Sequence, residues 1–129
     1  MSAASNYLED EILDHVLGKT TRDFTSPSTL VLALFSGTAS DVLAALEAGT
    51  SSTSGTGNWG HYEINTGGYT RKAITFNTAS GGSATNTGNV TYPTATANYN
   101  NTATSGSTVT CVAVLDNTSG GNVLFYGQL

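Results

Sequence analysis

A helical repeat of apolar residues runs between positions 6 and 17. Acidic residues fill most of the positions between them, so the pattern predicts an amphipathic helix of about three turns, with its acids on a solvated face. Asn6 is expected to cap this helix together with Glu9, and Gly18 is expected to end it in a left-handed conformation. The repeating apolar positions are Leu8, Ile12, Leu13, Val16 and Leu17.

A continuous apolar run over residues 30–35 comes next, and its length and flanking residues predict a strand that is covered on both faces. Residues 41–48 return to helical spacing and predict a short helix with Ser40 as its cap and Gly49 at its end. Residues 50–60 are rich in Ser, Thr and Gly, with too little apolar surface to offset the entropy of ordering, so they predict a mobile loop.

The second half of the chain has the residue types of β-strands and turns. Residues 71–76 predict a strand with Ile74 and Phe76 facing inward, and a turn at residues 80–83 leads to another predicted strand around Val90 and Tyr92. Residues 92–106 hold few large apolar groups and predict a weakly anchored surface stretch. Two final strands are predicted at residues 108–115 and 122–126, joined by a hairpin loop at residues 117–121.

This order of elements predicts one mainly β domain over residues 1–129. The best fit is an antiparallel β-sandwich with an N-terminal amphipathic helix over residues 1–18. A short helical insert and a flexible Ser/Gly loop are expected over residues 36–66. A chain of 129 residues can build one modest core of this kind.

The net charge of the chain limits the classes of binding partner that we expect. Four Lys and Arg residues stand against nine Asp and Glu residues, which gives a net charge of -5. Such a field repels phosphate backbones and anionic lipid, so we expect neither nucleic acid nor a membrane as a direct partner. The first residues show no signal peptide and no transmembrane pattern, and the protein is expected to be made in a cytosol.

Candidate catalytic and metal-binding residues are sparse. Residues 55–60 match the spacing of a dinucleotide-binding loop, but no strand precedes them and no helix follows, so we interpret them as a loop. His15 and His61 are not at metal-ligand spacing, and Cys111 lies in a strand pattern that predicts a buried apolar group. We therefore expect no catalytic residues, no metal site and no cofactor.

Three aromatic residues cluster around the predicted loop, namely Trp59, Tyr62 and Tyr69. An aromatic ring with a polar edge can anchor a protein partner or stack on a sugar. The same rings could instead fold back onto the core of the domain. The sequence leaves both interpretations open.

Several stretches, taken in order, resemble a family of small tailed-phage virion proteins that are tail-fibre-like or act as capsid decoration (cement) proteins. They are residues 7–17, Ser26 with Pro27 before the apolar strand, residues 67–76, and residues 120–127. The resemblance implies a β-sandwich without catalytic residues that assembles as identical copies, in a homotrimer. The chain departs from the family pattern at residues 36–65 and 98–106.

Two functions follow from this resemblance. The first is a capsid decoration protein on the outer capsid surface, which binds the major capsid protein and stabilises the coat lattice. The alternative is a tail-fibre or tail-tip module that binds a host glycan. A hydrolase would need paired acids at about 5–9 Å, and nothing in the sequence places Glu47 and Glu63 in that way. The residues expected to contact partners are Tyr7, Leu8, Ile12, Trp59 and Tyr62.

Overall fold

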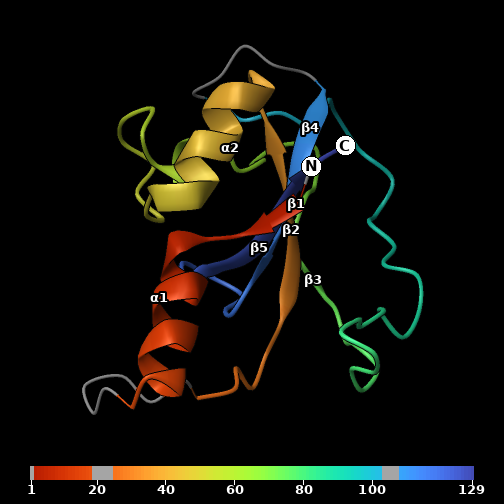
Figure 1. Ribbon diagram of the computed structural model, residues 1–129. Helices are drawn as coiled ribbons and strands as arrows, with labels where there is room; N and C mark the ends of the chain where they lie inside the picture. Colours follow the sequence, from red (N-terminus) through yellow and green to blue (C-terminus); the bar gives the residue numbers. More distant parts are fainter. Residues whose placement is uncertain (1, 19–24, 103–107) are drawn as a thin grey trace.

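The computed structural model describes residues 2–18, 25–102 and 108–129. Five strands form one antiparallel sheet in the order β1-β5-β4-β2-β3 (Figure 1). The strands are β1 (Ser2–Ala4), β2 (Val31–Ser36), β3 (Lys72–Ala73), β4 (Val109–Leu115) and β5 (Val123–Gln128). The other elements within these residue ranges are two helices, α1 (Asn6–Val16) and α2 (Ala39–Ala48), and a short 3-10 turn, η1 (Trp59–His61). The predicted mainly β, antiparallel class is confirmed.

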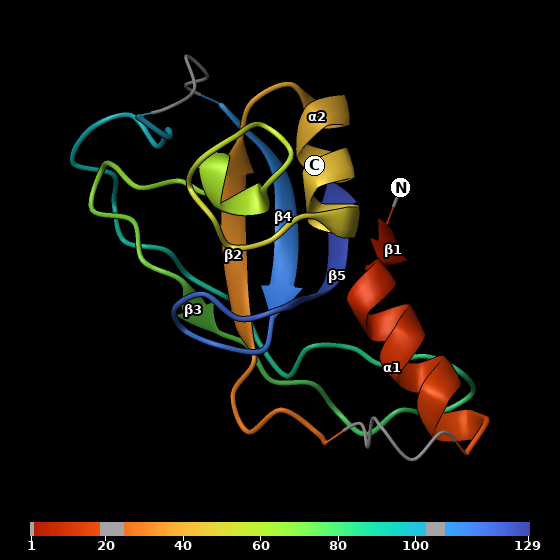
Figure 2. The same ribbon diagram turned by 90° about the vertical axis from the view of Figure 1, so that its left-hand side faces the viewer.

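The core lies between α2 and one face of the sheet (Figures 1 and 2). Alternate residues of β4 point into it, as expected for a strand with one covered face. Cys111 is one of them, and burial raises the pKa of its thiol, so it fills space as the sequence predicts. The core side chains of the two central strands and α2 are Val31, Ala33, Phe35, Cys111, Ala113, Leu115, Val42, Ala45 and Leu46.

A second sheet packed against the first, as in a sandwich, is not found among the strands of the described residues. Helix α2 and the segment around η1 form the layer over one face instead. Figure 1 shows the long segment after β3 on the opposite side of the sheet. Tyr92 attaches this segment to the sheet, because its hydroxyl donates a hydrogen bond to the Leu32 carbonyl at 2.7 Å.

The predicted strand over residues 71–76 is wrong in its length and in the direction of Phe76. Only Lys72 and Ala73 pair with β2, and Phe76 is 39% exposed in an isolated bridge to Asn86. The predicted strand around Val90 and Tyr92 is not a strand in the structure. Thr and Val residues in these stretches favour extended backbone, but extended backbone becomes a strand only where a neighbour offers hydrogen bonds.

Helix α2 begins at Ala39, two residues before the predicted start. Thr38, rather than Ser40, occupies the cap position, and Gly49 ends the helix as predicted. The turn at residues 80–83 is confirmed, with Gly81 and Gly82 both at positive φ.

The stretch over residues 92–106 is better anchored than the sequence predicts, although its last part lies outside the described residues. Asn101 is buried, with its backbone N–H donating to Ser36 Oγ at 3.2 Å and its side-chain amide donating to the Glu63 carbonyl. Thr66 Oγ1 donates to the Asn100 side chain at 2.6 Å. Polar side chains hold this stretch, so a scan for apolar residues could not detect the attachment.

Candidate interaction surfaces

The start of α1 is fixed to the sheet through Ser5. Its side-chain oxygen accepts a hydrogen bond from the Leu8 N–H at 3.4 Å and donates one to the Val123 carbonyl, and its own N–H donates to the Leu124 carbonyl at 3.0 Å. Ser5, not Asn6, is therefore the cap of this helix. Leu8 is buried beside this cap, and Gly18 at φ 68° follows the helix in the predicted left-handed conformation.

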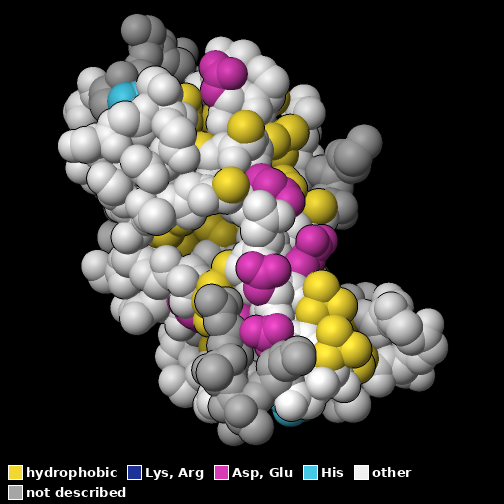
Figure 3. Space-filling view, turned by 60° about the vertical axis from the view of Figure 1, so that its left-hand side comes forward, with side chains coloured by type: hydrophobic (Ala, Val, Ile, Leu, Met, Phe, Trp, Pro, Cys, Tyr) yellow, Lys and Arg dark blue, Asp and Glu magenta, His cyan; other side chains and the backbone are white. Residues whose placement is uncertain are grey.

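The rest of the apolar repeat of α1 is uncovered. We call its four residues the α1 patch: Ile12 is 45% exposed, Leu13 55%, Val16 72% and Leu17 68%. Figure 3 shows hydrophobic side chains gathered over this helix beside acidic ones. A cluster of large apolar side chains at the surface of a small protein is typical of a contact with another molecule.

The sequence predicted that the acidic residues of α1 share one solvated face, and this prediction is wrong. Glu9 and Asp10 are exposed, but Glu11 and Asp14 are half-buried. The helix therefore turns part of its acidic side toward the protein and most of its apolar side outward. The apolar repeat predicts the helix correctly. Which side of the helix is buried depends instead on how Ser5 and Leu8 attach it to β5.

The aromatic residues near residues 50–60 fold back onto the core. Trp59 is 2% exposed and Tyr62 is 4% exposed, so their broad ring faces are not open to a macromolecular partner. Trp59 packs edge-on against Phe35, with ring centroids 6.3 Å apart. Of the five residues predicted to contact partners, Ile12 is exposed and Tyr7 is half-buried, whereas Leu8 is buried with Trp59 and Tyr62. Their roles in binding stay predictions.

An ion pair beneath Trp59 joins three loops. Arg71 Nε donates to Glu63 Oε1 at 2.6 Å and Nη2 donates to Glu63 Oε2 at 2.7 Å, which is the two-pronged geometry that guanidinium favours. Nη1 of the same residue donates to the carbonyls of Asn117 and Gly120 in the β4–β5 loop, both at 2.8 Å. The guanidinium carbon lies 5.4 Å from the Trp59 ring centre, within cation–π range. Arg71 therefore connects the η1 segment to the β4–β5 loop.

Tyrosine hydroxyls extend this polar network. Tyr69 accepts a hydrogen bond from the Leu34 N–H at 3.1 Å and donates one to Glu63 Oε1 at 3.3 Å, and its ring stacks on Tyr92. Burial, together with the nearby Glu63 charge, raises the pKa of both phenols well above the usual range. For Arg71, burial lowers the pKa, but the hydrogen bonds and charge of Glu63 outweigh it and the net pKa is raised.

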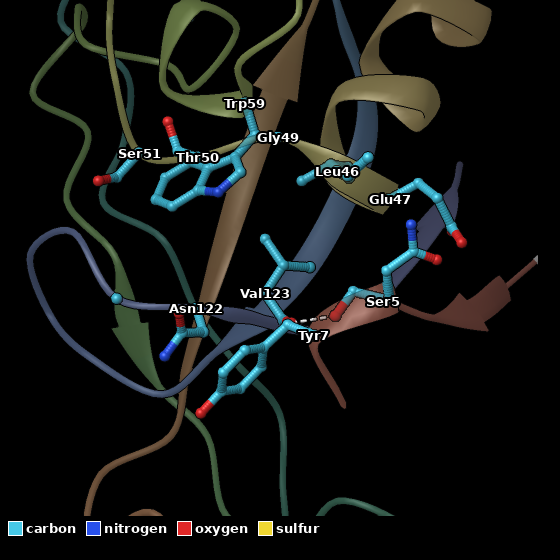
Figure 4. Close-up of a pocket in the computed structure, with 13 residues that line it drawn as sticks. Ser5, Tyr7, Leu46, Glu47, Gly49, Thr50, Ser51, Trp59, Asn122 and Val123 are labelled. Carbon is cyan, nitrogen blue, oxygen red and sulfur yellow. Dashed lines mark hydrogen bonds between the residues drawn. The ribbon is translucent and has the colours of Figure 1, made fainter. Parts of the chain in front are cut away.

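A hollow of about 280 Å³ lies next to this network, and Figure 4 shows its lining. We call it the Trp59 hollow. It is bounded by the end of α2, the start of α1 and the β4–β5 loop. Figure 4 shows Trp59 and Tyr7 on two sides of it, with Val123 between them and Leu46 on the α2 side. Its polar lining comes from Ser5, Asn6, Glu47, Thr50, Ser51 and Asn122.

Within residues 2–18, 25–102 and 108–129 no group of His, Cys, Asp and Glu side chains could hold a metal ion. Glu47 and Glu63 line different hollows, and Glu63 is engaged by Arg71. No helix in this part of the chain is long and apolar enough to cross a membrane.

Sequence reasoning missed the residues that organise these surfaces. Ser5 precedes the apolar repeat, and serine is among the residue types most favoured at helix N-caps. The sequence therefore contained a signal for this cap. The pairing of Glu63 with Arg71 had no such signal, because the two residues meet through the paths of two loops. The Trp59 hollow brings together residues that are far apart in sequence, and the periodicity of apolar residues contains no information about such contacts.

One comparison with known proteins gives a match. Residues 3–129 match the family model described as Podophage GP4 fiber I protein gp80. The match spans nearly the whole chain, including the α1 patch and the Trp59 hollow. No curated protein matches the chain.

Proposed function

From the premise that this chain belongs to the family of podophage GP4 fiber I protein gp80, we propose that it is a non-enzymatic component of a fibre on the outside of a tailed-phage particle. The family is one of small virion structural proteins, which agrees with the resemblance found in the sequence. The match over residues 3–129 is the observation on which the fibre assignment rests.

The α1 patch is the surface through which we propose that the protein assembles. Association between proteins needs area, shape and a desolvated apolar centre rather than a reactive pocket. The patch supplies such a centre, because its four apolar residues follow one another over two turns of a helix that Ser5 holds in place. The proposed partners are identical copies of this chain, in a homotrimer.

Capsid decoration is a second candidate. In that case the patch would bind the major capsid protein, and the protein would reinforce the coat lattice at the outer capsid surface. The resemblance found in the sequence supports this candidate, because it points to a family that includes capsid decoration proteins.

The number of copies in purified particles separates the two candidates. Quantitative mass spectrometry would compare peptides of this chain with peptides of the major capsid protein. A handful of copies per particle is the result expected for a fibre. Copies comparable in number to the coat subunits would establish decoration instead, and absence from particles would contradict both assignments.

A further inference from the structure

A row of directly paired residues crosses all five strands on the face of the sheet that points away from α2. Ala4 pairs with Phe125, Phe125 with Val114, Val114 with Leu32, and Leu32 with Lys72. Residues that lie directly opposite each other on neighbouring strands share a face of the sheet, and none of these five belongs to the core under α2. We call them the Phe125 row. Four apolar side chains therefore lie side by side, with a positive charge at the β3 end.

The Phe125 row is only partly covered. The long segment after β3 lies on this side of the sheet and is attached at the β2 position through the hydrogen bond from Tyr92 to the Leu32 carbonyl. The β5 position is open, because Phe125 is 52% exposed, and the other four residues of the row are half-buried. An exposed ring that continues a row of apolar side chains is a surface on which another molecule can pack.

The α1 patch carries a matching arrangement of charge and apolar groups. Glu9 is exposed and lies on the same side of α1 as Leu13 and Val16, because residues four and seven positions apart share a helix face. The helix rises about 8 Å from Glu9 to the middle of the patch, and two strand spacings of about 10 Å separate Lys72 from the β4 position of the row. A helix laid along the row would therefore bring Glu9 to Lys72 and the patch onto Phe125.

The two surfaces face different sides of the molecule. Figure 1 shows α1 on the same side of the sheet as α2, whereas the Phe125 row points to the other side. A contact between them therefore joins two copies, and each copy uses its patch toward one neighbour and its row toward another. Head-to-tail contacts of this kind close into rings such as a trimer, whereas a patch that pairs with itself across a two-fold axis gives a dimer. Two contacts per copy also bring the buried area closer to the roughly 800 Å² per partner of a standard interface.

We propose that the Phe125 row receives the α1 patch of a second copy of this chain, with Glu9 of one copy beside Lys72 of the next. The inference rests on the proposed assembly of identical copies and adds the surface with which the α1 patch pairs. The two can fail separately, because copies that associate through their α1 patches alone would still form oligomers without using the row.

A mixture of two assembly-defective variants tests the pairing. The patch variant is Leu13→Gln, Val16→Gln, and the row variant is Phe125→Thr, which keeps a strand-forming residue on β5. Each variant alone is expected to be monomeric in native mass spectrometry, because each retains only one of the two surfaces. An equal mixture is expected to form heterodimers, because the patch variant contributes its row and the row variant contributes its patch. A patch that pairs with a patch would give no heterodimer, since one of the two partners lacks an intact patch.

An exchange of charge tests the orientation. Glu9→Lys and Lys72→Glu are each expected to weaken assembly about tenfold, because an attraction between copies becomes a repulsion. The double variant is expected to regain assembly, since the two charges attract again with their positions exchanged. Asp41→Lys makes the same change of net charge at an exposed position at the start of α2, and this control should assemble like the unmodified chain.

The control for the row variant is Gln128→Thr, which lies on β5 but pairs with Cys111 on the α2 side of the sheet and should not affect assembly. Thermal unfolding checks that each variant is folded, and the charge exchange decides alone if Phe125→Thr unfolds. The proposal is overturned if the folded row variant assembles like the unmodified chain, if the mixture stays monomeric, or if the double charge variant assembles no better than the single ones. A monomeric unmodified chain would overturn it together with the homotrimer.

Discussion

The two helices of this protein have similar lengths and both carry apolar residues, yet they use them in opposite ways. Helix α2 buries Val42, Ala45 and Leu46 against the sheet. Helix α1 buries only Leu8 and exposes the four residues of the α1 patch. The burial that stabilises the chain therefore comes from α2 rather than α1, and most of the apolar surface of α1 is exposed.

This difference shows what an apolar repeat does and does not determine. A repeat at helical spacing predicts a helix with an apolar side, because burial of that side is the usual source of its stability. The partner that covers the side can be the same chain or another one. In α1 the cap at Ser5 replaces part of the missing burial, since it satisfies backbone groups at the start of the helix.

The largest effect should come from the buried side of α2. Leu46→Ala leaves a cavity between the helix and the sheet and is expected to lower the free energy of unfolding by about 3 kcal/mol. Leu13→Ala, the matched change on α1, should lower it by less than about 0.5 kcal/mol. Urea unfolding measures both, and equal losses would show that α1 is as well packed as α2.

The ion pair should give the next largest effect. Arg71→Met leaves the largely buried Glu63 carboxylate without its partner and is expected to cost about 3 kcal/mol or slightly less. Lys72→Met removes a neighbouring positive charge and serves as the control. Comparison of their urea midpoints would contradict the account if both variants were destabilised to the same extent.

High pH should weaken the network around Tyr69. Below about pH 10 its phenol is neutral in both the folded and the unfolded chain, so the stability that it contributes is fully present. Above that value the unfolded chain loses the proton, whereas the folded chain keeps it, because burial and the charge of Glu63 raise the pKa of Tyr69 and Tyr92. The free energy of unfolding should therefore fall as pH rises.

Tyr69→Phe sharpens this prediction. The variant should lose about 1 kcal/mol at neutral pH, because the Leu34 N–H loses its acceptor. It should also show a shallower decline of stability in alkali, because one of the two buried phenols is gone. Thermal unfolding over a series of pH values tests both statements, and an unchanged alkaline slope would contradict the second.

The α1 patch should have the smallest effect on stability and a large effect on assembly. The double variant Leu13→Gln, Val16→Gln keeps helix-forming residues and is expected to change the free energy of unfolding by about 0.5 kcal/mol or less. Its oligomers should dissociate in analytical ultracentrifugation. His15→Gln, exposed on α1 outside the patch, is the matched control and should assemble like the unmodified protein.

Deletions can also compare the N-terminal helix with the loop over residues 50–60, but each deletion removes structural contacts as well as surface. Removing residues 1–18 is expected to weaken assembly, as measured by light scattering, more than removing residues 50–60. The first deletion also removes the buried Leu8, while the second removes hydrogen bonds between Thr50 and Asn58 that close the loop. The point variants of the patch are preferable because they change only exposed side chains.

The parts of the fold that were predictable are those with local signals. Helix α1, strand β2 and the β4–β5 hairpin follow from apolar periodicity and glycine positions, and the structure confirms them. The direction of Phe76 and the attachment of Asn101 depend on which segments become neighbours, and the sequence pattern does not contain that information. The same limit applies to the interaction surfaces. Ile12 was identified from its repeat, but its exposure results from the way in which α1 leaves the sheet.

The most direct test of the account is the incorporation of the α1 patch variant into phage particles. Particles would be assembled with the unmodified chain, with Leu13→Gln, Val16→Gln, or with His15→Gln, and copies would be counted by mass spectrometry against the major capsid protein. We predict a handful of copies for the unmodified chain and for His15→Gln, and a strong loss for the patch variant. Full incorporation of the patch variant would contradict the claim that α1 is the surface by which this protein enters the virion.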